Sequence, residues 1–270
     1  MPDAHLLEHI KSDAKSSTRL TKTPLQVSFV TNVANSNHRD HWFRRTTWTA
    51  KDQEEFFARL NRSRDSGKPQ YLRIQALHLS NAGLSRESLE LSDYLLSKFP
   101  TDAELAMVFL TRAESYEALG ELDLAVESFR ASLAAQRARP TMRTNAWLDF
   151  GRFVVSHRMK NLYPEVCSVL DEFSEPEGLV FPAGRFIYLA VRAHMYENSD
   201  QMDEAISCAK GALEAAMATH SGFAFHAEVG LVRDPSQKLM QQLKRLASGK
   251  PSQNVMSNLV DRWKLGKRKF

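Results

Sequence analysis

The apolar residues between positions 69 and about 246 recur at i, i+3 and i+4 in segments of roughly 12 to 18 residues. This spacing is typical of amphipathic helices, and the alternation typical of strands is nearly absent. Glycine or proline separates the segments, at Gly83, Pro100, Gly120, Pro140, Pro164, Pro176, Pro182, Gly222 and Pro235. Amphipathic segments with short breaks predict a series of antiparallel helix pairs and therefore an all-α fold.

The clearest helix pair runs from residue 106 to 136, with its turn at Gly120. Small residues are predicted where the two helices cross: Ala113, Ala125 and Ser132. Bulky residues are predicted to fill the space between them: Phe109, Tyr116 and Phe129. Close helix crossing requires small side chains at the contact. In these positions the segment resembles a tetratricopeptide repeat (TPR).

The same template recurs along the chain at a spacing of about 34 to 40 residues. The first copy uses Leu72, Ala76, Leu79 and Ser88, and the fourth uses Leu189, Ala193, Tyr196, Ala205, Ala209 and Ala212. The third begins with Trp147, Gly151 and Val154, but Pro164 is predicted to interrupt its second helix. The resemblance spans residues 69–215 and implies a TPR-like α-solenoid, a right-handed superhelical stack of antiparallel helix pairs. A different helical bundle is the alternative.

A capping helix is predicted before the repeats, because Thr49 and Asp52 have the spacing of a helix N-cap. Its apolar face is Phe56, Phe57 and Leu60, and Trp42, Phe43 and Trp48 precede it. These aromatic residues are expected to seal one end of the core, and a ligand-stacking cage is the alternative. A last amphipathic helix carries Leu239, Leu243 and Leu246.

Three regions follow from this pattern. Residues 1–40 are predicted to be a flexible N-terminal extension, although residues 25–29 alternate like a strand. Residues 41–248 form the predicted helical repeat domain with its capping helix. Residues 249–270 form a basic C-terminal tail.

Composition agrees with a soluble globular protein of 270 residues, of which 43% are hydrophobic and 25% charged. The net charge of +4 is weak support for a polyanionic partner. The sequence has neither a secretory signal nor an apolar run of the length that crosses a membrane. Cys167 and Cys208 lie in helical patterns and are expected to be free, buried thiols. A cytoplasmic protein without membrane contact is therefore predicted.

The sequence signatures of catalysis are missing. No dinucleotide-binding, phosphate-loop or nucleophile-elbow pattern occurs. His38 and His41 have no second cluster of metal ligands, and His220 and His226 lie in a Gly-containing loop where surface or capping roles are expected. We therefore expect a protein that is not an enzyme and that needs no metal or cofactor.

In the TPR family, partners contact first-helix residues that point away from the packing face. The resemblance implies a binding face made of Gln70, Arg73, Leu77, Asn81, Glu114, Glu117, Asn145, Arg152, Ser156, His194, Glu197 and Asn198. Its mixed charge suits a protein or peptide better than a polyanion. Leu77, Thr111 and Asp149 replace residues of the family's two-carboxylate clamp, so a chaperone-tail receptor is not expected. A scaffold or adaptor protein is predicted. One form of such a scaffold is an inhibitor, or an antitoxin-like partner, of another protein.

Nucleic-acid binding is the alternative function. It would use an arginine-rich segment, consisting of Arg39, Arg44, Arg45, Arg59, Arg62 and Arg64. It would also use the basic tail, through Arg262, Lys264, Lys267, Arg268 and Lys269. Scattered basic residues of this kind are more often a solvated surface.

Overall fold

The computed structural model describes residues 42–174, 179–223 and 227–250. All regular elements in these residues are helical, and they comprise ten α-helices and two short 3-10 turns. The α-helices are α2 (Ala50–Arg62), α3 (Lys68–Asn81), α4 (Ser85–Lys98), α5 (Leu105–Leu119), α6 (Leu122–Ala138), α7 (Ala146–Ser156), α8 (Tyr163–Phe173), α9 (Pro182–Asn198), α10 (Met202–Ala216) and α11 (Gln237–Ala247). The 3-10 turns are η1 (Asp65–Gly67) and η2 (Lys160–Leu162).

The all-α prediction is therefore confirmed for the described residues. None of the helices in these three stretches combines the length and apolar character needed to cross a bilayer. The predicted N-terminal extension, its strand-like segment and the tail beyond residue 250 lie outside the described residues.

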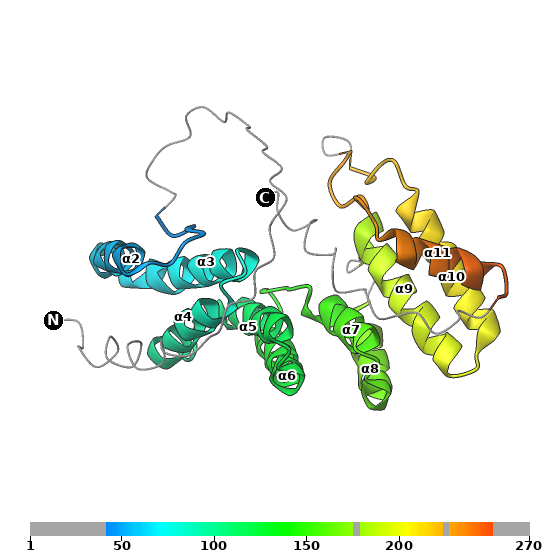
Figure 1. The fold of residues 1–270 in the computed structure, drawn as a ribbon, viewed down its shortest axis with the longest axis horizontal. Helices are drawn as coiled ribbons and strands as arrows, with labels where there is room; N and C mark the ends of the chain where they lie inside the picture. The colour runs from blue at the N-terminus through cyan, green and yellow to red at the C-terminus, as the bar shows by residue number, and fades with distance from the viewer. Residues whose placement is uncertain (1–41, 175–178, 224–226, 251–270) are drawn as a thin grey trace, which may run out of the picture. The chain divides into compact units, whose positions relative to one another are not determined.

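Consecutive helices pack in pairs: α3 with α4, α5 with α6, α7 with α8, and α9 with α10 (Figure 1). Each first helix ends in the same kind of turn, with one residue in the left-handed region. These residues are Gly83 (φ 84°), Gly120 (φ 78°), Arg158 (φ 56°) and Asp200 (φ 57°).

A backbone hydrogen bond accompanies each of these turns. The amide after the left-handed residue donates to the carbonyl five residues earlier, as in the Schellman motif. The four bonds are Leu84 N to Leu79 O (2.9 Å), Glu121 N to Tyr116 O (3.0 Å), Met159 N to Val154 O (3.0 Å) and Gln201 N to Tyr196 O (3.0 Å). Four helix pairs are thus closed by one repeated piece of backbone geometry.

This geometry predicts opposite effects for two substitutions. Gly120→Ala should lower the free energy of unfolding by about 1–2 kcal/mol, because an L side chain is strained at positive φ. Arg158→Gly should raise it by up to about 1 kcal/mol, since glycine relieves that strain but is more flexible in the unfolded chain. Urea denaturation of both variants measures the effect, and shifts in the same direction would contradict it.

Small residues occupy the helix crossings as predicted. Ala113, Ala125 and Ser132 are fully buried between α5 and α6. Two serines also bond to the facing helix: the Ser132 hydroxyl donates to Ala106 O (2.6 Å), and the Ser88 hydroxyl donates to Ala76 O (2.8 Å). These serines therefore act as spacers and satisfy their own hydroxyl groups.

Four side-chain contacts between neighbouring helix pairs join residues that are 35 positions apart in the sequence. Ser115 Oγ donates to Ser80 Oγ (3.1 Å). Three bidentate ion pairs have the same separation: Arg152–Glu117, Arg130–Glu165 and Arg137–Glu172. These four contacts thus have the spacing of the sequence repeat.

The capping helix begins where the sequence predicts. The Thr49 hydroxyl accepts from Asp52 N (3.2 Å), and Asp52 Oδ2 accepts from Thr49 N (2.9 Å), which is a complete capping box. Phe56 and Leu60 on its inner face are buried. Trp42 packs against Phe56 with a centroid distance of 5.4 Å.

Three clusters of buried apolar residues form the core. The first joins α2, α3 and α4, the second lies around α6, α7 and α8, and the third joins α9, α10 and α11. Helix α5 belongs to two of them, since Val108 packs in the first and Ala113 in the second. Helix α9 is shared likewise, with Val191 in the second and Ala193 in the third.

Two expectations need correction. Pro164 does not interrupt a helix: α8 begins at Tyr163, so the proline lies in its first turn, where no intrahelical N–H bond is needed. Cys167 and Cys208 are free as predicted, but they are half-buried rather than buried. Burial still raises the pKa of both thiols, with nearby charges as smaller influences.

Candidate functional site

The twelve residues of the predicted binding face lie on the first helices of the four pairs or at their ends. Four are exposed: Gln70, Asn81, Asn145 and Asn198. Five are half-buried: Arg73, Leu77, Glu114, Arg152 and Glu197. Three are buried: Glu117, Ser156 and His194. Whether they bind a partner stays a prediction.

The three buried residues do not present open side chains, contrary to the sequence expectation. Ser156 Oγ donates to Phe153 O within its own helix (2.9 Å). His194 is only 2% exposed. Glu117 is turned toward α7, where it meets a guanidinium group. Helical periodicity places these positions off the main packing face, but contacts with other helices bury Glu117 against α7 and place His194 beside Val155 of α7 and Leu239 of α11.

The two basic residues predicted for this face are both in ion pairs. Arg73 bonds to Glu104, at the start of α5. Arg152 donates through both terminal nitrogens to Glu117, at 2.9 and 3.2 Å. Their charges therefore join neighbouring first helices and are already matched by carboxylates.

Glu117 is the centre of a buried polar cluster between α5 and α7. Besides Arg152, His157 approaches it, with Nε2 3.2 Å from Glu117 Oε1. Asp149 Oδ1 lies 3.8 Å from Arg152 Nε. Burial alone would raise the pKa of Glu117, but the bonds from His157 and the charge of Arg152 outweigh it and lower the pKa to about 2. Burial likewise opposes the charge of Arg152, yet the carboxylates of Glu117, Asp149 and Glu114 raise the pKa of its guanidinium.

The lowered pKa of Glu117 predicts a loss of stability in acid. Its pKa falls from 4.5 to about 2 on folding, so its stabilising effect is complete above pH 4.5 and is lost as the pH falls toward 2. In Glu117→Gln the free energy of unfolding should depend less on pH in this window, by up to about 1.4 kcal/mol per pH unit. Denaturant titrations between pH 5 and 2 measure this slope. A slope equal to that of the wild type would contradict the assignment.

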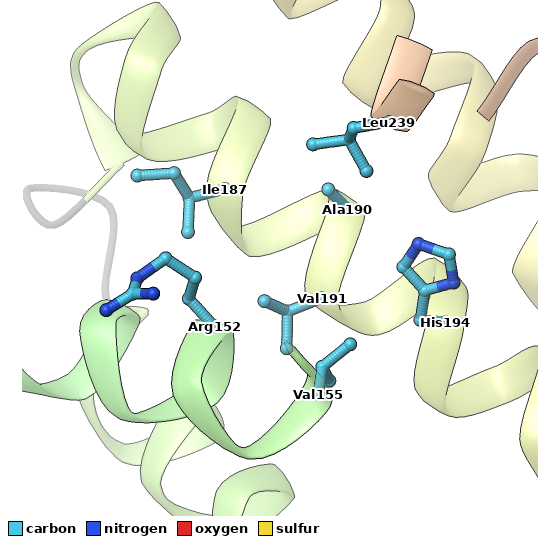
Figure 2. Close-up of a pocket in the computed structure, with 7 residues that line it drawn as sticks. All are labelled: Arg152, Val155, Ile187, Ala190, Val191, His194 and Leu239. Carbon is cyan, nitrogen blue, oxygen red and sulfur yellow. The ribbon is translucent and has the colours of Figure 1, made fainter. Parts of the chain in front are cut away.

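A small pocket adjoins this cluster between α7, α9 and α11 (Figure 2). Its volume is about 20 Å³, room for a water molecule or a methyl group. The walls are apolar and consist of Val155, Ile187, Ala190, Val191 and Leu239. Figure 2 shows Arg152 and His194 on opposite sides of these apolar residues.

His194 is the most unusual group of this pocket. Its Nδ1 lies 3.6 Å from Glu197 Oε2, one helical turn away. Its buried Nε2 has no hydrogen-bond partner among the residues that the structure describes. Leaving a buried polar atom unpaired costs about 1–3 kcal/mol, so this nitrogen lowers the stability of the local packing. The sequence offered no signal for this pocket, because α7, α9 and α11 are distant along the chain.

The arginine-rich segment is partly engaged within the fold. Arg45 bonds to Asp52 (2.5 Å) and Glu55 (2.6 Å). The buried Gln75 also holds the Arg45 backbone, accepting from its N–H (3.0 Å) and donating to its carbonyl (2.8 Å). Four arginines of the segment are exposed: Arg44, Arg59, Arg62 and Arg64. Arg39 and the basic residues of the tail lie outside the described residues.

Within residues 42–174, 179–223 and 227–250, no three His, Cys, Asp or Glu side chains gather in a way that could hold a metal ion. The two thiols are far from the pattern of an activated cysteine, since burial raises their pKa. The site is therefore a set of ion pairs and a small apolar pocket along the first helices. Comparisons with family models, with curated proteins and with solved structures find no match to this chain.

Proposed function

We propose that this chain is a non-catalytic scaffold that binds a protein or peptide along its first helices, α3, α5, α7 and α9. In this proposal the four helix pairs stack as a TPR-like solenoid. The exposed amides of Gln70, Asn81, Asn145 and Asn198 supply hydrogen bonds to the partner. A cytoplasmic adaptor or inhibitor would have this architecture.

The observation that carries the proposal is the repeated contact between successive helix pairs. Ion pairs and a serine bridge recur at a separation of 35 residues, and the same turn closes all four pairs. Repeated packing of this kind supports a stack in which every first helix faces the same side. A row of equivalent helices offers an extended surface, which suits an extended macromolecule better than a small substrate.

Co-purification from the native host tests the proposal. Arg73 and Arg152 are poor targets, because both are in ion pairs whose loss would harm the fold. The double variant Asn145→Arg/Asn198→Arg instead changes two exposed positions at the ends of first helices, Asn145 just before α7 and Asn198 at the end of α9. It should reduce retention of the specific partner at least about tenfold, since bulky charges disturb a close interface.

The matched control is Ala134→Arg/Ser207→Arg, which adds the same charge to exposed positions on the second helices α6 and α10. This control should retain the partner as the wild type does. Equal retention by both double variants, measured by quantitative mass spectrometry, would overturn the assignment of the binding face.

A further inference from the structure

Exposed apolar side chains gather at one end of α9. Six large apolar side chains are exposed among the described residues, and five of them lie in the segments 180–181 and 217–229. Four of these belong together and are called the apolar patch below: Val180, Phe181, Phe223 and Val229. A single exposed apolar side chain is ordinary in a folded protein, but a cluster of them marks a surface for contact with another molecule.

The patch is held in place by its own backbone. The ring of Phe181 stacks on that of Phe223, with 5.3 Å between the centroids. The N–H of Ala183, in the first turn of α9, donates to the carbonyl of Gly230 (2.8 Å), which joins this helix to the loop before α11. Gly230 has a φ of 71°, and a β-carbon at this position would collide with the Phe181 ring. A surface fixed in this way loses little conformational entropy when a partner binds.

A positive charge borders the patch. Arg185 follows Phe181 by one helical turn, is exposed, and has no ion-pair partner among the described residues. The first turn of α9 adds the positive end of the helix dipole. Other charges on these segments are already matched: Arg233 pairs with Glu228 (3.4 Å), and Asp234 lies just before α11, whose dipole favours a carboxylate. The charge left beside the rings is therefore positive.

We propose that the apolar patch binds a peptide segment that carries a large apolar side chain next to a carboxylate. The apolar side chain lies on the rings of Phe181 and Phe223, and the carboxylate pairs with Arg185. Four side chains are far fewer than the roughly 20–30 residues a side of a stable protein interface, so one or two anchor residues cover the patch.

This binding site goes beyond the proposed function, because it does not use the exposed amides of the first helices. Asn198, at the other end of α9, lies roughly 25 Å from Phe181 along the helix. The patch can therefore be tested apart from that surface.

Selection of a random peptide library on the immobilised full-length protein tests the site. Enriched peptides should carry an aromatic or large aliphatic residue next to Asp or Glu. A representative enriched peptide, measured by fluorescence anisotropy, should bind Phe223→Ala and Arg185→Glu at least about tenfold more weakly than the wild type. Both variants should keep the fold, because much of the Phe223 ring is in water and a carboxylate is favourable in the first turn of α9.

Matched controls change the same residue types elsewhere. Leu124→Ala removes an exposed apolar side chain on α6, and Arg86→Glu reverses an exposed charge in the first turn of α4. Both should bind the peptide as the wild type does. Asn198→Arg alters the first-helix surface and should also leave peptide binding unchanged, so failure of the proposed function and failure of this site are distinguishable.

Enriched peptides without an apolar residue beside an acidic one, or equal affinity for Phe223→Ala and Leu124→Ala, would overturn the proposal. Self-association in analytical ultracentrifugation that Phe223→Ala abolishes would assign the patch to a second copy. Sedimentation with vesicles of phosphatidylserine and phosphatidylcholine, lost in the same variant, would assign it to a membrane surface. Either result also overturns the proposal.

Discussion

Replacing Arg152 by methionine is expected to lower the free energy of unfolding by about 3–5 kcal/mol. The substitution leaves Glu117, whose side chain is 4% exposed, charged and buried without its guanidinium partner. The cost arises from this unpaired carboxylate, because a matched buried pair contributes little net stability. Urea denaturation monitored by circular dichroism measures the change.

The control is an ion pair of the same chemistry and sequence separation. Arg137 and Glu172 also form a bidentate pair, but their side chains are 46% and 40% exposed. Arg137→Met should therefore cost less than about 1 kcal/mol. The double variant Arg152→Met/Glu117→Met should recover much of the loss, since it removes the stranded charge. Equal losses for Arg152→Met and Arg137→Met would show that burial does not govern these pairs.

Phe129→Ala should lower the free energy of unfolding by a similar amount, about 3–5 kcal/mol. The ring is completely buried and lies 5.5 Å from the ring of Phe150 and 5.3 Å from that of Phe153. Its removal leaves a cavity between α6 and α7 that these neighbours can fill only in part. The midpoint of thermal or urea unfolding measures the effect.

A second aromatic pair serves as the comparison. Phe223 stacks on Phe181 at 5.3 Å, but it is 43% exposed. Phe223→Ala should cost less than about 1 kcal/mol, because little surface is removed from water by this ring. A loss below 1 kcal/mol for Phe129→Ala would mean that α6 and α7 are not joined through this ring.

Much of the helical arrangement can be predicted from the sequence, because packing requirements leave a local pattern. Ala113, Ala125 and Phe129 are spaced as a close helix crossing needs, and all three are buried. Gly120 marks its turn because glycine adopts positive φ without strain. Arg158 and Asp200 make the same turn without such a marker. Backbone strain carried by an ordinary residue has no signature in a single sequence.

The candidate site is less predictable, because its properties depend on neighbours distant along the chain. Periodicity indicates that Glu117 and Arg152 point away from their own helix partners. It does not indicate that these two side chains, which are 35 positions apart in the sequence, form an ion pair that is largely shielded from solvent. The pocket beside them also needs Leu239 from α11. Contacts between helix pairs therefore decide which of the predicted binding-face side chains remain exposed to solvent.

Helices α5 and α9 each contribute residues to two of the three apolar clusters. If one terminal cluster melts, its shared helix loses one packed side and keeps the other. Unfolding of α10 and α11 thus exposes apolar residues of α9 to water. Because α9 also packs in the central cluster, this exposure couples the unfolding of the terminal helices to the stability of the central ones. We therefore expect these two shared helices to couple the unfolding of the three clusters, so that substitutions in α5 or α9 change how far the clusters unfold together.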